Sequence, residues 1–265
     1  MSNIETLRVA SDFDRSAASY ETYAQVQWQV MTRLLEQLIP YLEDELSPHV
    51  LDIGCGTGWL ADAVRMHNLM WKLKGIDIAP SMVEAAFKKG VDATLGSAES
   101  LPYEDDSMDG VFSSMCIQWL ERPERMLSDV YRVLKPGAVA VIGTLESATL
   151  KELRDSFAFY GEHTRVMEFR SDVEWLEMAK KSGFLIEQMH INTWRYPYPN
   201  LLTLLKTLRG IGATNKRYDR PKNLAGLRLF ANVEHIYETH HARLDDGIWA
   251  TWQPIILVLK KPASL

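Results

Sequence analysis

The chain has 265 residues, of which 46% are hydrophobic and 24% charged, and its formal net charge is −6. This is enough for one domain with a sizeable core, and the acidic balance argues against nucleic-acid binding by bulk electrostatics. The two cysteines argue against a disulfide framework and fit a reducing compartment. Without a signal-peptide pattern or an apolar run long enough to cross a membrane, we expect a cytoplasmic protein.

The first predicted element is helical and covers residues 1–40. Apolar residues recur there at the spacing of one helix face: Val26, Val30, Leu34 and Leu38. Pro40 ends this pattern, and a short polar link, "EDELSP", separates the helix from the first predicted strand. We therefore expect a helical N-terminal segment over residues 1–44.

From residue 49 onward, strand patterns alternate with helical ones. The predicted strands are 49–53, 72–78, 91–96, 108–115 and 138–145. The predicted helices are 59–67, 81–90 and 123–137. The second helix carries a predicted capping box, Ser81 with Glu84, and a stop at Gly90. This alternation predicts a parallel sheet covered by helices on both faces.

The C-terminal half continues the pattern and then interrupts it. A helix is predicted over 171–184 and a strand over 185–194. Residues 198–246 break the rhythm with helices and basic loops, and 247–261 supplies a final strand or strand pair. The economical division is an N-terminal helical segment (1–44), a doubly wound core (45–197), a helical insertion (198–246) and the last strand of the core (247–265).

The stretch "VLDIGCGTG" places three glycines directly behind a buried strand, where a ligand can approach the backbone closely. Proteins that bind NAD, FAD or S-adenosylmethionine (SAM) all use such a loop. The spacing of Gly54, Gly56 and Gly58 is G-x-G-x-G, without the third glycine of the dinucleotide pattern. Asp52 precedes the glycines, where its carboxylate would accept from the amino group of methionine and would repel a pyrophosphate. Both details favour SAM.

Two later strand ends complete a predicted nucleoside site. Asp77 closes the second strand, where a carboxylate accepts hydrogen bonds from both hydroxyls of a ribose. The third strand ends in "GSAESLPYEDDSMD", a turn that borders the adenine in this fold. Ser97, Ala98 and Glu99 are the candidates there.

Four blocks, "VLDIGCGTG", "GIDIAPSM", "GSAESLPYEDDSMDGVFSS" and "LSDVYRVLKPGAVAVIGTL", together resemble the class I SAM-dependent methyltransferases. The resemblance implies an α/β, Rossmann-like, mostly parallel seven-stranded sheet that binds SAM, forms S-adenosylhomocysteine (SAH) and needs no metal. Many relatives carry an acidic residue where Ser97 stands. The implied cofactor-binding residues are Asp52, Gly54, Gly56, Gly58, Asp77, Ile78, Met82, Ala98, Glu99 and Ser114.

The flanks extend the resemblance. "FDRSAASYETYAQVQWQ", "SMCIQWL", "GTLESATLKELRDSF" and "LLTLLKTLRGIGATN" are similar to the O-methyltransferases of biotin synthesis, which methylate the free carboxylate of malonyl-acyl carrier protein. In that family the N-terminal segment folds over the active site as a lid. The implied acceptor-binding residues are Tyr20, Tyr23, Gln118, Trp119 and Arg154. Three further arginines, Arg15, Arg165 and Arg170, are rivals for the malonyl carboxylate.

The acceptor chemistry is consistent with this resemblance. A carboxylate, with a pKa of roughly 3–4, is already ionised at neutral pH and needs no general base. The enzyme must then align the reactants and exclude water. Two alternatives remain: a methyltransferase of another small acid or a quinone-like ring, and a SAM-binding or protein-binding module without catalysis.

Residues 200–230 reverse the overall charge of the chain, with seven basic residues against one acidic residue, Asp219. Acyl carrier proteins are strongly acidic, so this patch is a candidate docking surface for malonyl-acyl carrier protein, with malonyl-CoA as the other acceptor. The proposed partner-binding residues are Lys206, Arg209, Arg217 and Arg220. A solvated loop and an RNA-binding patch are the rival interpretations, although the patch has few aromatic residues for stacking on bases.

Overall fold

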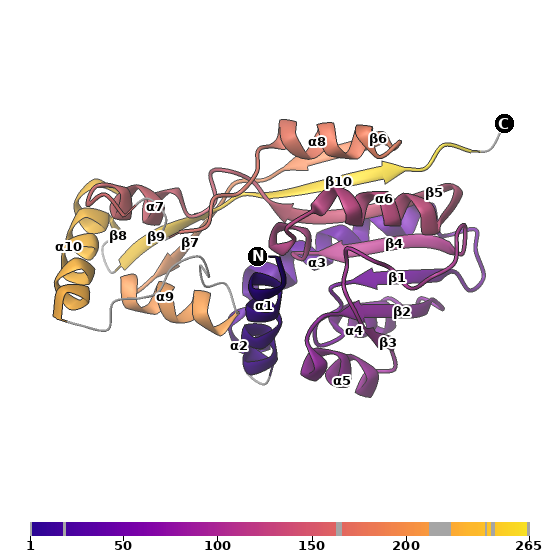
Figure 1. Ribbon diagram of the computed structural model, residues 1–265, viewed down its shortest axis with the longest axis horizontal. Coiled ribbons are helices and arrows are strands. Elements are labelled where there is room, and N and C mark those ends of the chain that lie inside the picture. Colours follow the sequence, from indigo (N-terminus) through magenta and orange to yellow (C-terminus); the bar gives the residue numbers. More distant parts are fainter. Residues whose placement is uncertain are drawn as a thin grey trace.

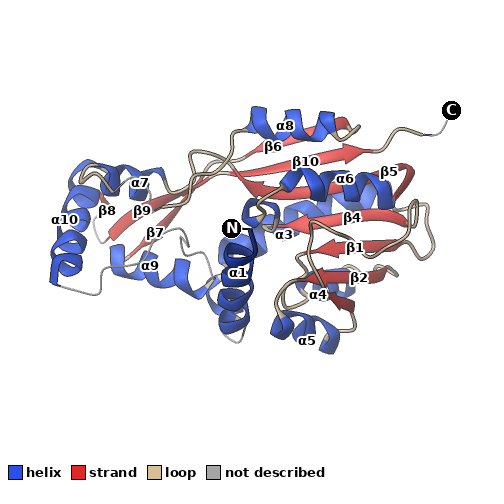
Figure 2. Cartoon of the chain, in the orientation of Figure 1, coloured by secondary structure: helices blue, strands red, loops and turns tan. Residues whose placement is uncertain are grey.

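The computed structural model describes residues 2–17, 20–162, 166–211, 224–241, 243–244 and 247–263. At its centre lies a seven-stranded sheet with the order β3-β2-β1-β4-β5-β10-β6 (Figures 1 and 2). Its strands are β1 (His49–Ile53), β2 (Lys72–Asp77), β3 (Asp92–Leu95), β4 (Met108–Ser114), β5 (Leu134–Leu145), β6 (Leu185–Ile191) and β10 (Pro254–Lys260). β10 runs antiparallel to β5 and β6, and the other pairs in this sheet are parallel. The predicted α/β fold is confirmed.

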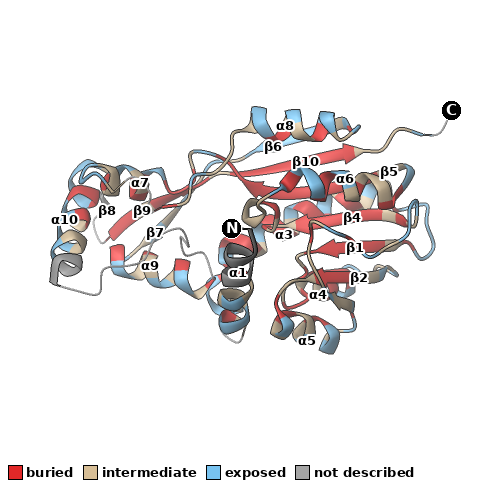
Figure 3. Ribbon diagram, viewed as in Figure 1, coloured by how far each residue is buried: buried red, intermediate tan, exposed pale blue. Residues whose placement is uncertain are grey.

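Helices cover both faces of this sheet, because successive strand residues point to opposite sides. On one face α3 (Gln25–Leu38) and α4 (Trp59–Met66) pack against Val50, Phe112 and Val141, and the predicted inner face of α3 is buried. On the other face α6 (Pro123–Val133) and α8 (Asp172–Lys181) pack against Leu51 and Ile142. Figure 3 shows the central strands as mostly buried between these layers.

Three further helices belong to this part of the molecule. α1 (Ser2–Ser16) and α2 (Tyr20–Tyr23) precede α3, so the predicted N-terminal helical segment is confirmed. α5 (Pro80–Lys88) packs beside β2 and β3. Two short 3-10 helices, η1 (Ile39–Tyr41) and η2 (Ile117–Trp119), follow α3 and β4.

The predicted capping box at Ser81 is wrong. Helix α5 begins one residue earlier, at Pro80, and no side chain caps its N-terminus. The Ser81 hydroxyl instead donates to Asp14 of α1, at 2.6 Å, which is a tertiary contact that the local pattern could not predict. A capping box does form at α8, where Ser171 and Glu174 bond reciprocally.

A second, three-stranded sheet lies at the other end of the molecule (Figure 1). It contains β7 (Trp194–Tyr198), β9 (Gly247–Trp252) and β8 (Arg243–Leu244), with α7 (Lys151–Ala158), α9 (Leu201–Gly210) and α10 (Leu224–His240) around it. The predicted strand over 185–194 is thus divided between the two sheets. The predicted final segment is a strand pair, β9 and β10, which join the two sheets through Gln253. The division into four segments remains a prediction.

Within the described residues, no helix has both the length and the apolar character needed to span a bilayer.

Candidate active site

The loop between β1 and α4 contains the three predicted cofactor glycines. Gly54, Gly56 and Gly58 have φ values of +72°, +52° and +80°, which residues with a side chain rarely adopt. A β-carbon at Gly54 would lie 2.6 Å from the Cβ of Cys116, whereas one at Gly56 would meet no atom within 4 Å. Packing inside the protein therefore requires Gly54 to be a glycine, and the space beside Gly56 leaves room for a ligand.

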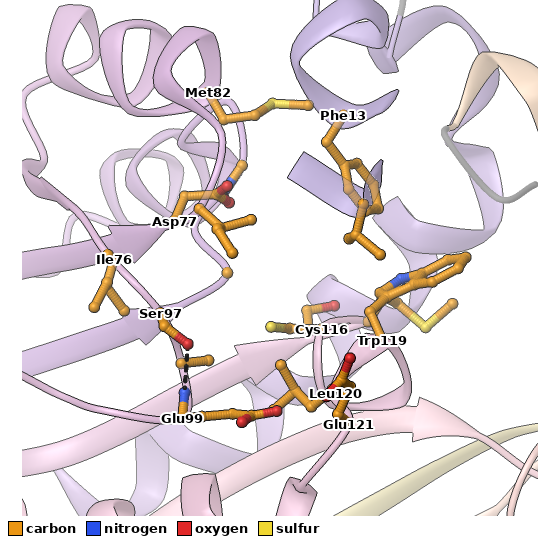
Figure 4. Close-up of a pocket in the computed structure, with 18 of the residues that line it drawn as sticks. Phe13, Ile76, Asp77, Met82, Ser97, Glu99, Cys116, Trp119, Leu120 and Glu121 are labelled. Atoms are coloured by element: carbon orange, nitrogen blue, oxygen red, sulfur yellow. Dashed lines mark hydrogen bonds between the residues drawn. The ribbon is translucent and has the colours of Figure 1, made fainter. Parts of the chain in front are cut away.

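A cavity opens beside Gly56 at the carboxyl ends of the central strands, with about 850 Å³ of empty space including the part open to solvent. Figure 4 shows Asp77 and Glu99 on one side of this cavity and Phe13 and Trp119 on the other. Eight predicted cofactor residues line it: Gly54, Gly56, Asp77, Ile78, Met82, Ala98, Glu99 and Ser114.

A smaller cavity, of about 400 Å³, adjoins the first on the side of β1. Asp52 lines this smaller cavity and not the larger one. The residues that line both are Tyr20, Gly54, Gly56 and Ser114. An elongated ligand can therefore extend from the predicted nucleoside residues to Asp52.

Asp77 stands at the junction of β2 and the glycine loop. Its carboxylate accepts from the backbone N–H of Gly56 and of Ala79, each at 2.9 Å. Burial raises the pKa of Asp77, and these backbone donors act in the opposite direction. The carboxylate thus fixes the glycine loop and still lines the larger cavity.

Asp52 is 5% exposed and accepts no hydrogen bond from the described residues. Burial raises the pKa of Asp52 to about 8, with the nearby charge of Asp77 as the second cause. A buried carboxyl group without a partner is unfavourable. The smaller cavity therefore presents an acceptor suited to a cationic ligand group.

The turn after β3 is already tied to the rest of the protein. The Glu99 carboxylate accepts from the backbone N–H of Arg122 at 2.9 Å and from its Nε at 3.3 Å. The backbone N–H of Glu99 donates to Ser97 Oγ at 3.1 Å. This turn is held in place by its own contacts, and Ala98 lines the cavity between these two residues.

Comparisons with known proteins identify the family of the chain. Residues 51–142 match a family model described as "Methyltransferase domain". The malonyl-[acyl-carrier protein] O-methyltransferase of Herminiimonas arsenicoxydans is 32% identical over 238 residues, which cover 90% of each chain. The chain belongs to the class I SAM-dependent methyltransferases.

Other relatives extend the comparison. The methyltransferase is 30% identical over 268 residues to the biotin biosynthesis bifunctional protein BioHC of Teredinibacter turnerae, and it spans 47% of that protein's length. Among solved structures, the YcgJ protein of Bacillus subtilis superposes with a TM-score of 0.60 at 21% identity, over 88% of this chain and 99% of the other. A Haloferax volcanii methyltransferase solved with its Trm112 activator gives a TM-score of 0.61 at 18% identity, over 97% and 99%. These two structures support the fold alone.

The residues present fit SAM. Asp77 lines the larger cavity and could accept from a ribose diol, and Asp52 lines the smaller cavity and could accept from an ammonium group. The open space at Gly56 lets the ligand pass close to the backbone between them. Among the described residues, no group of three or more His, Cys, Asp or Glu side chains could hold a metal ion.

The N-terminal helices of the methyltransferase close over the cavities. Val9, Phe13 and Tyr20 line the larger cavity, and the Phe13 ring meets the Trp119 ring edge-on at 5.7 Å. Burial is the main cause that raises the pKa of the Tyr20 hydroxyl, followed by the charge of Asp77, so Tyr20 stays protonated. One wall of the site is therefore aromatic.

Two carboxylates, Asp14 and Glu21, attach helices α1 and α2, which we call the lid, to the core. Asp14 of α1 accepts from the backbone N–H of Ser81 at 2.9 Å and from its hydroxyl. Glu21 of α2 accepts from Thr57 Oγ1 at 2.7 Å and from Lys89 Nζ at 2.9 Å. Thr57 belongs to the glycine loop, so the lid is bonded directly to the loop that borders both cavities.

The predicted acceptor residues are not all at the cavities. Trp119 and Tyr20 line the larger one, whereas Gln118 accepts from Thr144 Oγ1 and donates to the Met115 carbonyl, at 3.0 and 2.8 Å. Gln118 thus ties the end of β4 to that of β5. Tyr23 is 40% exposed and packs beside Gly210 of α9.

The predicted arginines that the structure describes do not line either cavity. Arg154 donates to the carbonyls of Thr149 and Ser147, where it stabilises the loop after β5. Arg15 pairs with Asp12 on the surface, and Arg170 stacks over the Trp175 ring at 5.6 Å. Arg165 lies outside the described residues.

Gly58, the third predicted cofactor glycine, caps α4. A β-carbon at Gly58 would lie 3.0 Å from Ala86 Cα.

Lys206 and Arg209 are exposed on α9. Arg217 and Arg220 lie outside the described residues.

Sequence reasoning missed several lining residues that come from the N-terminal helices and from the turn after β4. They are Val9, Phe13, Gln27, Met31, Cys116 and Glu121. Val9 and Phe13 are spaced one helical turn apart, as are Gln27 and Met31, so each pair shares one helix face. That spacing was the available signal, but it does not tell which surface the face meets.

Proposed function

We propose that this methyltransferase transfers the methyl group of SAM to the free carboxylate of a malonyl thioester carried by an acyl carrier protein, an early step of biotin synthesis. The product is the methyl ester. The proposal is supported by similarity to the Herminiimonas arsenicoxydans enzyme along 90% of both chains. The make-up of the cavity walls gives independent support.

The main support from the structure is the composition of the cavity walls. The described residues that line the two cavities include no Lys, Arg or His. The lining carboxylates are Asp52 and Asp77 at the cofactor, Glu99 bonded to Arg122, and Glu121. An amine or phenol acceptor must lose a proton before or during methyl transfer, and histidine is the side chain most often used for that step. An acceptor that is already anionic needs no such group.

A carboxylate acceptor suits cavity walls without a general base. Its pKa is roughly 3–4, so it is ionised at neutral pH and its oxygen is already nucleophilic. SAM supplies an electrophilic methyl group on a positively charged sulfur. The protein has to hold the acceptor oxygen in line with that methyl group and keep water out. The Phe13 and Trp119 rings exclude water, and a poorly solvated carboxylate is a stronger nucleophile.

A surface beside the lid fits an acidic carrier protein. Leu202, Lys206 and Arg209 are exposed and recur at the spacing of one face of α9. Helix α9 packs against α2, where Tyr23 meets Gly210. This face combines an apolar residue with two cations next to the lid, as expected of a docking site for an acidic helix bearing a long prosthetic arm.

The proposal is tested by incubating the purified enzyme with methyl-labelled SAM and four acceptors: malonyl-carrier protein, malonyl-CoA, free malonate and succinyl-carrier protein. Mass spectrometry should show one added methyl group on the malonyl thioesters, with the carrier-bound form preferred. Mild alkaline hydrolysis should release the label as methanol, which identifies an ester. Labelling of free malonate alone, label that resists hydrolysis, or no transfer to any malonyl group would refute the proposal.

A further inference from the structure

Helix α3 presents one polar residue to the smaller cavity. Most of its inner face is aliphatic and packs on the sheet, but Gln27 lines the cavity, and so does Met31 one turn later. Gln27 is only 7% exposed. Its amide makes no hydrogen bond with any described residue, and its polar atoms are open to the cavity rather than sealed in the protein. An unpaired amide that a mostly buried residue presents to a cavity points to a ligand group that completes it.

The charges around the cavity define that ligand group. Asp52 lines the same cavity, and its carboxyl group can pair with a cation when it is ionised. Tyr20, Trp59 and Ser114 also line it with groups that can donate, and the Thr57 hydroxyl is already used by Glu21 of the lid. The described lining of this cavity contains no Lys, Arg or His. An anionic ligand group at this place would therefore find the Gln27 amide N–H as a donor.

The amino-acid end of SAM carries both charges on a single carbon atom. If its ammonium lies at Asp52, its α-carboxylate must lie within a few ångströms, inside the same cavity. We infer that the side-chain amide of Gln27 donates to the α-carboxylate of SAM and SAH, and so fixes the rotation of the amino-acid end around Asp52. This inference rests on SAM binding and is independent of the proposed malonyl acceptor.

A neutral anchor has a chemical advantage over an arginine here. A cation at the α-carboxylate would lie near the sulfonium and near the path of an anionic acceptor, which it would attract into the wrong place. An amide binds the carboxylate through its dipole and adds no net charge. Gln27 thus holds the carboxylate without adding a positive charge, so the only cations of the loaded site are the sulfonium and the ammonium that pairs with Asp52.

The test uses calorimetric binding of two probes, SAH and its decarboxylated analogue, which keeps the amino group and lacks only the carboxylate. Wild-type enzyme should bind SAH about ten- to hundredfold more tightly than the analogue, as expected for a hydrogen bond to a charged group. Gln27→Leu should weaken the binding of SAH by about ten- to hundredfold. The same substitution should change the affinity for the analogue less than twofold. Gln25→Leu, at an exposed position of the same helix, should change neither.

Gln27→Glu adds a second diagnosis because it keeps the size of the side chain. Its carboxylate repels the α-carboxylate, so SAH should bind more weakly than to Gln27→Leu, whereas the analogue should bind at least as well as to wild type. Equal losses for both probes in Gln27→Leu would overturn the inference, as would an unchanged affinity for SAH. The readout is binding alone, so failure of the malonyl proposal leaves it unaffected.

Discussion

Asp52 offers a sharp test of the site because cofactor binding must change its protonation. Burial raises the pKa of Asp52 from 3.8 to about 8, and the charge of Asp77 contributes in the same direction. At pH 7 about nine tenths of the ligand-free molecules therefore carry a neutral Asp52 carboxyl group. An amino group of SAH is protonated under the same conditions.

Before binding, the Asp52 carboxyl group and the SAH amino group each carry an ionisable proton that the ion pair cannot keep in full. The pair of carboxylate and ammonium has one such proton fewer. Binding of SAH should release about one proton per site near pH 7, and the affinity should rise about tenfold per pH unit between about pH 5 and pH 7. Asp52→Asn cannot release this proton. The variant should bind SAH more weakly, by about 1.5–3 kcal/mol, and its affinity should lose this pH dependence.

Isothermal titration calorimetry in two buffers of different ionisation enthalpy counts the released protons. Asp77 can also release a proton. The decisive quantity is therefore the number of protons released by wild type minus the number released by Asp52→Asn. A difference near one proton supports the assignment. The same buffer dependence in both proteins would show that Asp52 is ionised before binding or does not meet the amino group.

The same pKa shift affects the stability of the ligand-free protein. A carboxyl group whose pKa is raised on folding contributes stability that is fully present below its unfolded pKa of 3.8 and is lost as the pH rises to about 8. We therefore expect the free energy of unfolding of Asp52→Asn, measured by denaturant titration, to increase relative to that of wild type as the pH rises from about 4 to about 8. A constant difference would contradict the shift.

Three further predictions concern the loop, the lid and the docking face. Gly54→Ala, with a β-carbon 2.6 Å from a cysteine side chain, should lower the free energy of unfolding by about 1–3 kcal/mol more than Gly56→Ala, which has the strain of a positive φ but meets no atom within 4 Å. Gly56→Ala should in addition lower SAH affinity, and an equal loss of stability in the two variants would contradict this. Glu21→Gln should speed SAH dissociation about three- to tenfold in stopped flow by loosening the lid, and an unchanged rate would separate the lid from release. Lys206→Glu with Arg209→Glu should slow methylation of malonyl-carrier protein far more than of malonyl-CoA, with equal losses indicating damage to the pocket.

The sheet and the cofactor loop could be predicted because their signals are local. A glycine that must adopt a φ of +72°, as Gly54 does, leaves its mark in the residue type itself. Asp77 follows a buried strand, and parallel strands bring their carboxyl ends to one edge of the sheet. Eight predicted cofactor residues meet at one cavity for this reason.

Contacts made by docking of distant segments could not be predicted in the same way. Ser81 has the sequence pattern of a helix cap, but Asp14 of another helix takes its hydrogen bonds. Arg154 lies in the expected helix, but the nearest free carbonyls belong to its own loop. Gln27 sits within an apolar helix pattern that does not tell which surface its polar position meets.

The lid and the cofactor share one structural element, the glycine loop. Thr57 bonds to Glu21 of the lid, and the adjacent Gly56 borders the space for the cofactor. A ligand on Gly56 therefore restrains the residue that holds the lid, and a closed lid places the Tyr20 ring over both cavities. Cofactor binding and lid closure should then stabilise each other. For the proposed carboxylate acceptor, which needs no base, we expect this closure to contribute to the rate, because it would remove water from a carboxylate and a sulfonium whose charges cancel as the methyl group moves.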